Sequence, residues 1–122
     1  MNKSQKATKN WLSLNDNKDF IRLYKRGKNV VTPVFVLYFN KNNLPYNRIG
    51  ITTSKKIGNA VNRNRARRVI KAAIINSQSI FPKGYDFVFV ARVRSTKEKS
   101  TVVERYMRIT MDKQFGSRGR NQ

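Results

Sequence analysis

The sequence contains no cysteine and no histidine, and only 6 of its 122 residues are acidic. Without cysteine it has neither disulfides nor thiolate metal sites, which suits a reducing compartment. The lack of histidine and of paired carboxylates removes the usual general bases and metal cages of a nuclease. No apolar run reaches the roughly 18 residues of a membrane span, and no signal-peptide core follows the polar start. We therefore expect a cytoplasmic protein that does not bind membranes and has no catalytic residues of its own.

Basic residues are abundant by contrast. The 27 lysines and arginines give a formal net charge of +21 and a pI near 11.3. Such an imbalance destabilises a compact chain by self-repulsion, and its usual reason is a polyanionic partner. No carboxylate lies between Asp19 and Asp86, so the positive charge belongs to the body of the protein as well as to its ends. The composition predicts a nucleic-acid-binding protein.

The length and the 39 % of apolar residues suit a single domain with one core. We expect a flexible basic arm over 1–14, one RNA-binding domain over 15–115 and a disordered tail over 116–122. Trp11 and Leu14 are candidates to anchor the arm. No internal repeat is found.

Local patterns predict the secondary structure of this domain. Asp16 and Asp19 suit the start of a short helix that ends at Gly27. β-branched and aromatic residues predict strands, and apolar periodicity predicts two further helices. The expected strands cover 28–39 with a break at Pro33, 48–53 and 85–92, and the expected helices cover 59–77 and a stretch from Ser95 or Thr96 to about 111. The order α-β-β-β-α-β-α predicts an α+β sandwich with a four-stranded mixed sheet.

The helix expected over 59–77 contains most of the basic stretch 54–71, which holds seven basic residues and no acid. One face, by its i, i+3, i+4, i+7 spacing, carries Asn64, Arg67, Arg68 and Lys71, and the opposite face carries Ala66, Val69, Ile70 and Ala73. A helix face that is merely solvated normally mixes charges of both signs, but this one carries only positive charges. The guanidinium group of arginine can bind two phosphate oxygens at once. The pattern therefore predicts a phosphate-binding surface.

The segment from Ser54 to Arg68 closely resembles the signature of the protein subunit of bacterial ribonuclease P, in which a lysine pair and a glycine precede an arginine-asparagine-arginine helix. Weaker matches extend the resemblance to roughly 15–115: Asp19-Phe20 with Tyr24 and Gly27, Phe35 to Tyr38, Arg48-Ile49-Gly50, and Asp86 with Ala91-Arg92. Two positions depart from the pattern. Arg67 stands where lysine is usual and Tyr24 where phenylalanine is common, and both keep the charge or the aromatic character.

The resemblance implies a fold like the second domain of ribosomal protein S5, with a left-handed β-α-β crossover through the basic helix. Handedness statistics alone would argue against such a crossover. It also implies a function as the protein component that joins the ribonuclease P RNA subunit and helps this catalytic RNA remove the 5′ leader from precursor tRNA. Mg²⁺ would be held mainly by the RNA, and no obligate protein partner is evident.

The resemblance further implies two RNA-binding surfaces. The catalytic RNA would contact the lysine pair and the basic helix through Lys55, Lys56, Asn59, Arg63, Asn64, Arg65, Arg67, Arg68 and Lys71. A cleft between the first helix and the sheet would receive the single-stranded leader through Phe20, Tyr24, Val36, Tyr38 and Arg48. Their spacing agrees, because Phe20 and Tyr24 share a helix face and Val34, Val36 and Tyr38 share a strand face. Bases can stack on such aromatic walls, although Phe20 and Phe35 fit an ordinary core equally well.

Other interpretations of single residues and of the whole chain stay open. Asp86 suits a structural ion pair with Arg92 or with the basic helix better than a metal ligand, and metal binding by the protein itself is undecided. A ribosomal or ribosome-assembly RNA-binding protein without a catalytic role would have a similar composition. A DNA-binding protein is less compatible, because a strand-like segment rather than a helix-turn-helix precedes the basic helix.

Overall fold

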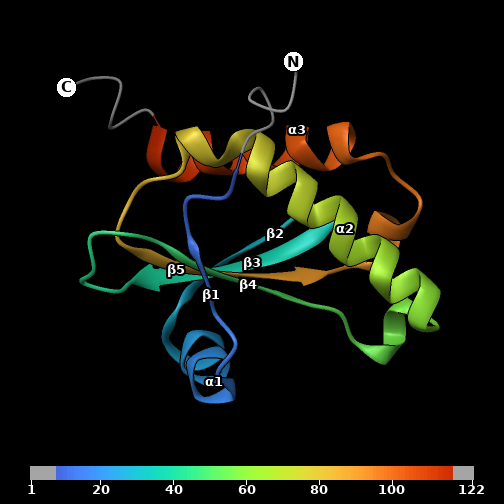
Figure 1. Cartoon of the computed structure of the whole chain (residues 1–122), viewed down its shortest axis with the longest axis horizontal. Helices are drawn as coiled ribbons and strands as arrows, with labels where there is room; N and C mark the ends of the chain where they lie inside the picture. Colours follow the sequence, from blue (N-terminus) through green and yellow to red (C-terminus); the bar gives the residue numbers. More distant parts are fainter. Residues whose placement is uncertain (1–7, 117–122) are drawn as a thin grey trace.

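The computed structural model describes residues 8–116. Residues 1–7 and 117–122, which hold half of the expected arm and most of the expected tail, lie outside the described part. One sheet separates helix α1 on one face from helices α2 and α3 on the other (Figure 1). The elements are β1 (Leu12–Ser13), α1 (Asn17–Arg26), β2 (Lys28–Val31), β3 (Phe35–Lys41), β4 (Arg48–Thr52), η2 (Lys55–Ile57), α2 (Ala60–Ser77), η3 (Gln78–Ile80), β5 (Tyr85–Ala91), η4 (Val93–Thr96), α3 (Ser100–Met111) and η5 (Asp112–Gly116).

The sheet has five strands in the order β1-β4-β5-β3-β2, one more than the sequence predicted. Strands β4 and β5 are parallel neighbours joined through α2, so a β-α-β crossover runs through the basic helix, and its left-handedness stays a prediction. The additional strand β1 pairs in parallel with β4, where the Leu14 backbone N–H donates to the carbonyl oxygen of Ile49 at 2.9 Å. Its two residues belong to the segment expected to be a flexible arm, so the folded unit begins before residue 15.

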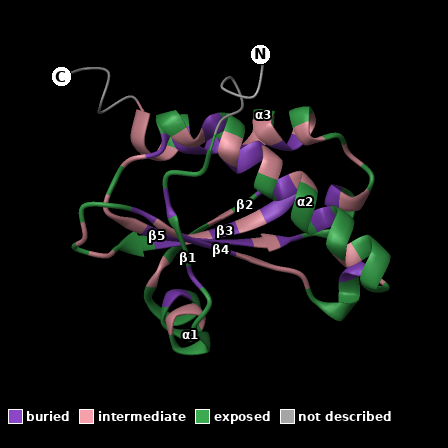
Figure 2. Cartoon of the chain, in the orientation of Figure 1, coloured by how far each residue is buried: buried purple, intermediate pink, exposed green. Residues whose placement is uncertain are grey.

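The main core lies between the sheet and the helices α2 and α3. Alternation along β3 and β5 directs Phe35, Leu37, Phe39, Phe87 and Phe89 into it, against Ile70 and Ile74 of α2 and Val103 and Met107 of α3. Burying each such side chain contributes about 1.5–3 kcal/mol. Figure 2 shows the buried residues along the sheet and on the inner sides of these helices. Phe35 is therefore a core residue.

A smaller cluster lies on the opposite face of the sheet, under α1. Leu14, Leu23 and Val88 are buried there, and Phe20, Tyr38 and Val90 pack against them. Val34, which was expected to share this face with Val36 and Tyr38, packs in the main core instead. The reason is that β3 begins only at Phe35, so strand alternation does not extend to Val34.

Four helix ends can be compared with the ends that the sequence predicted. Asp16 accepts a hydrogen bond from the Lys18 backbone N–H at the start of α1, and Gly27 ends this helix as predicted. Helix α2 begins at Ala60, one residue after the predicted start, because Asn59 is its cap. Helix α3 is present as predicted, but its predicted start was wrong, since it begins at Ser100 after the short helix η4. The hydroxyls of Ser95 and Thr96 donate back to carbonyl oxygens within their own turn and so cannot cap α3.

Helix η5 continues α3 by one turn and ends at Gly116, the first residue of the predicted tail. Phe115 in this turn meets Phe39 and Tyr85 with ring centroids 5.3 and 5.1 Å apart. These long-range aromatic contacts hold a segment whose composition suggested fraying. Among the helices of residues 8–116, none has the length and apolar character needed to cross a membrane.

Candidate nucleic-acid interface

A glycine turn sets the lysine pair in front of α2. Gly58 adopts a φ of 127°, a conformation that side chains disfavour, and an added Cβ would lie 2.9 Å from Nδ2 of Asn62. The Gly58 carbonyl oxygen accepts a hydrogen bond from Arg63 Nη1 at 2.7 Å. Lys55 and Lys56 are exposed on η2, just before a helix whose first turn contains no acid. The positive end of the α2 dipole therefore adds to the charge of the lysine pair.

Helix α2 has the two faces that its sequence predicted. Ala66, Ile70 and Ala73 are buried against the core and Val69 is half-buried. The residues expected to bind RNA lie outward: Asn64, Arg65, Arg67, Arg68 and Lys71 are exposed, and Arg63 is half-buried. Asn59 is exposed too, but its Oδ1 accepts from the Asn62 backbone N–H, so only its amide nitrogen is left for RNA.

Neutral oxygens hold three of the four arginines of α2. Besides the Arg63 bond, Arg65 Nε donates to the Thr96 carbonyl oxygen at 2.7 Å, and Arg67 Nη1 donates to the Ile51 carbonyl oxygen at 2.7 Å. No residue of α2 takes part in any of the ion pairs within residues 8–116. The guanidinium groups are thus fixed in position while their charge stays uncompensated. This arrangement lowers the side-chain entropy that binding a phosphate would otherwise cost.

Arg67 differs from the sequence prediction in its direction. It reaches back from α2 to Ile51 of β4, and its Nη2 also donates to Oγ1 of Thr53, the residue after β4, at 3.2 Å. Asn64, Arg68 and Lys71 make no side-chain hydrogen bond within the described residues. These three side chains are therefore the most available for a ligand on the exposed face of α2.

The residues expected to bind the leader lie on the α1 face of the sheet. Tyr24, 42 % exposed, meets Tyr38 of β3 edge-on with ring centroids 4.9 Å apart. Phe20 crosses β4 at Gly50, where an added Cβ would lie only 2.6 Å from the Phe20 ring. Val36 is half-buried on the same face of β3 as Tyr38. The structure thus places the four apolar members of the expected cleft on one face of the sheet, with both tyrosines accessible in part and Val36 outside the cluster under α1.

Arg48, the fifth expected leader contact, is engaged by a buried carboxylate. Its Nε and Nη2 donate to the two oxygens of Asp86 at 2.8 and 2.7 Å, and this hydrogen bonding raises the pKa of Arg48. Arg22 Nη2 also binds Asp86 at 2.8 Å and Arg22 Nη1 binds Asp19 at 2.6 Å. Two arginines and two aspartates therefore form a cluster without net charge. The leader contact of Arg48 stays a prediction, and its charge is already balanced.

The expected partners of Asp86 were wrong, although its structural role was predicted. Asp86 is 1 % exposed and faces the α1 side, because strand alternation turns it away from α2. The register of β4 and β5 places Arg48 directly beside it. Arg92 instead donates to the Thr32 carbonyl oxygen at 3.0 Å. Within residues 8–116 no group of three or more His, Cys, Asp or Glu side chains that could hold a metal ion is found.

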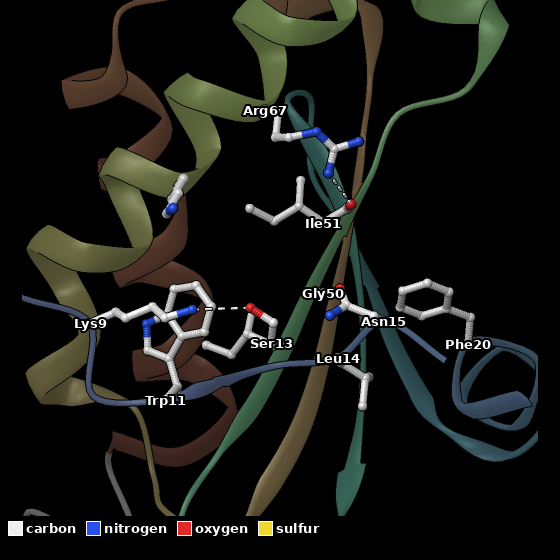
Figure 3. Close-up of a pocket in the computed structure, with 11 residues that line it drawn as sticks. Lys9, Trp11, Ser13, Leu14, Asn15, Phe20, Gly50, Ile51 and Arg67 are labelled. Carbon is white, nitrogen blue, oxygen red and sulfur yellow. Dashed lines mark hydrogen bonds between the residues drawn. The ribbon is translucent and has the colours of Figure 1, made fainter. Parts of the chain in front are cut away.

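A notch beside β1 contains residues that the sequence analysis did not assign to any site. It is a cavity of about 370 Å³ between the N-terminal segment, α1, β4 and α2 (Figure 3). Lys9 and Trp11 line it although they belong to the expected arm, and Lys9 Nζ lies 4.6 Å from the centre of the indole ring. Only a basic residue paired with an aromatic one in an otherwise polar arm could have suggested this site.

Comparisons with known proteins agree with this geometry. The family model described as Ribonuclease P matches residues 9–114. The chain is 47 % identical to a ribonuclease P protein component of Pelotomaculum thermopropionicum over 91 residues, covering 75 % of this chain and 81 % of the relative. A ribonuclease P protein component of Clostridium beijerinckii is 38 % identical over 107 residues, covering 82 % and 86 %.

Solved structures of similar proteins have the same fold. The ribonuclease P protein of Thermotoga maritima superposes with a TM-score of 0.74 at 27 % identity, covering 83 % of this chain and 96 % of the other. The protein from Staphylococcus aureus gives 0.73 at 29 %, covering 84 % and 94 %. Together with the geometry of α2, the family match over most of the chain leads to one conclusion: the chain belongs to the ribonuclease P protein family, whose members are components, together with an RNA subunit, of a tRNA-processing ribonucleoprotein endoribonuclease.

Proposed function

We propose that this chain binds the ribonuclease P RNA through the lysine pair and the exposed face of α2, and holds the 5′ leader of precursor tRNA against the α1 face of the sheet. The observation that supports this most is the uncompensated charge of α2. None of the seven basic side chains of 54–71 forms an ion pair with a carboxylate within residues 8–116. An RNA backbone would neutralise them and release its own counterions.

The two proposed surfaces lie on opposite faces of the sheet, since α1 and α2 pack on opposite sides of it (Figure 1). One RNA can therefore occupy α2 while a single strand lies along Tyr24 and Tyr38. Aromatic side chains stack on bases largely regardless of sequence. This tolerance suits leaders whose sequences differ between tRNA precursors.

The chemistry of cleavage belongs to the RNA subunit in this proposal. The chain has no histidine and no cysteine, and both oxygens of the buried Asp86 are occupied by arginines. Mg²⁺ bound by the RNA would supply the activated water and stabilise the leaving oxygen. The protein contributes binding energy, positioning and screening of phosphate charge, and its cytoplasmic location and lack of an obligate protein partner stay predictions.

Cleavage of precursor tRNA tests this function directly. The protein alone should leave the precursor intact, the cognate RNA subunit alone should act poorly at low Mg²⁺, and the two together should release the leader at the mature 5′ end. Protein treated with a ribonuclease and repurified is the control for carried-over RNA. Cleavage at the mature end by this RNA-free protein would contradict the proposal, and so would a mixture no faster than the RNA alone.

A further inference from the structure

The notch at the edge of the sheet arises because β1 is only two residues long. β1 covers β4 at Arg48 and Ile49, and the chain then turns away toward α1. The next two residues of β4, Gly50 and Ile51, pair with β5 on one side but line an open cavity on the other, where β1 no longer pairs with β4. Its volume of about 370 Å³ lies within the roughly 300–1,000 Å³ of small-molecule sites.

The charge in the notch is of one sign. Lys9, Arg67 and Lys71 line it, and no carboxylate does. Arg67 is held in place by the Ile51 carbonyl oxygen, so its guanidinium is fixed at the rim, as Figure 3 shows. Lys71 makes no hydrogen bond or ion pair within residues 8–116, which leaves its ammonium group free for an anion.

The rest of the wall suits a planar ring. Trp11 lies on one side of the notch and Phe20 on the other (Figure 3). Trp11 is 6 % exposed, and its Nε1 has no hydrogen-bond partner in the described part of the chain. The Asn15 side chain, exposed at the rim, offers both a donor and an acceptor. Cations beside aromatic rings are the combination that binds a phosphate and a base together.

We propose that this notch is a nucleotide-binding site, in which Arg67 and Lys71 bind the phosphate and the aromatic wall contacts the base. It shares Phe20 with the expected leader cleft and Arg67 and Lys71 with the α2 surface, but it opens at the β4 edge and is also lined by the N-terminal segment. A nucleotide of a bound RNA and a free nucleotide share this chemistry. Binding of a nucleotide of the RNA rests on the proposed function, whereas binding of a free nucleotide does not.

Trp11 is the only tryptophan in the chain, so its fluorescence reports on the wall of the notch and on the adjoining core. Titration of the full-length protein with adenosine 5′-monophosphate should change this fluorescence in a saturable way. Adenosine, which lacks the phosphate, should bind at least about tenfold more weakly than the monophosphate. The substitution Lys71→Gln removes one charged hydrogen bond and should weaken the monophosphate about tenfold. Lys83→Gln, at an exposed position outside the notch, is the matched control and should bind like the wild type.

The source of the nucleotide is decided by adding the RNA subunit. If the RNA fills the notch, it abolishes the response to the monophosphate. If a free nucleotide is the ligand, the response persists in the assembled enzyme. The phosphorus NMR signal of the monophosphate gives a second measurement that does not depend on the indole.

The proposal is overturned if neither the monophosphate nor the RNA affects Trp11 or the phosphorus signal, or if adenosine binds equally well. It is also overturned if Lys71→Gln, folded by circular dichroism, binds the monophosphate as tightly as Lys83→Gln. None of these results would change the outcome expected in the cleavage assay. An error in the proposed nucleotide site can therefore be distinguished from an error in the proposed function.

Discussion

Replacing Tyr24 with alanine should separate binding of the leader from binding of the rest of the tRNA. The Tyr24 ring is 42 % exposed and meets Tyr38 edge-on at 4.9 Å. Losing this aromatic pair costs about 0.5–1.5 kcal/mol of folding free energy. A leader base stacked on the exposed ring contributes about 1–3 kcal/mol to binding. The substitution should therefore lower the affinity of the assembled enzyme for precursor tRNA by about fivefold to 150-fold.

The assay compares the dissociation constants of the assembled enzyme for precursor tRNA and for mature tRNA. Mature tRNA has no leader, so Tyr24→Ala should leave its affinity unchanged, and the preference for the precursor should fall. Tyr24→Phe keeps the ring and is the matched control, which should retain the preference. Equal losses for both tRNAs would refute the stacking, as would an unchanged preference. A drop in thermal stability well beyond the loss of the aromatic pair would assign Tyr24 to the core.

Three further substitutions test the rest of the structure. Asp86→Asn removes the carboxylate that Arg22 and Arg48 share, and it should lower the free energy of unfolding by about 2 kcal/mol. The loss is smaller than for a fully buried pair because both arginines are partly exposed. An unchanged urea midpoint would mean that the cluster does not stabilise the fold. Gly50→Ala places a Cβ 2.6 Å from a ring carbon of Phe20 and should lower the free energy of unfolding by about 1–3 kcal/mol in the same assay. Native stability would show that α1 moves freely away from β4. Arg68→Gln breaks no hydrogen bond or ion pair within residues 8–116, so the free energy of unfolding should stay native. For binding of the RNA subunit, the slope of log K against log salt concentration should flatten by about 0.7–0.9. An unchanged slope would exclude a phosphate contact at Arg68.

The sequence by itself determined the features that depend on local periodicity. The spacing of Ala66, Ile70 and Ala73 predicted which side of α2 is buried, and Asp16 and Gly27 predicted where α1 begins and ends. The charge of α2 was equally visible, because no acid is near it in the chain. Local signals were sufficient here, since a helix face and a cap are decided by residues three or four positions apart.

Only the tertiary structure decided the features that join distant segments. Strand β1 has two residues, too few for any pattern, and exists because the edge of β4 offers it backbone partners. The register of β4 on β5 gave Asp86 to Arg48 instead of Arg92, and the packing of α2 turned Arg67 back onto Ile51. The notch follows from all of these together. Its walls come from four segments whose separations along the chain depend on long-range pairing, which no local propensity encodes.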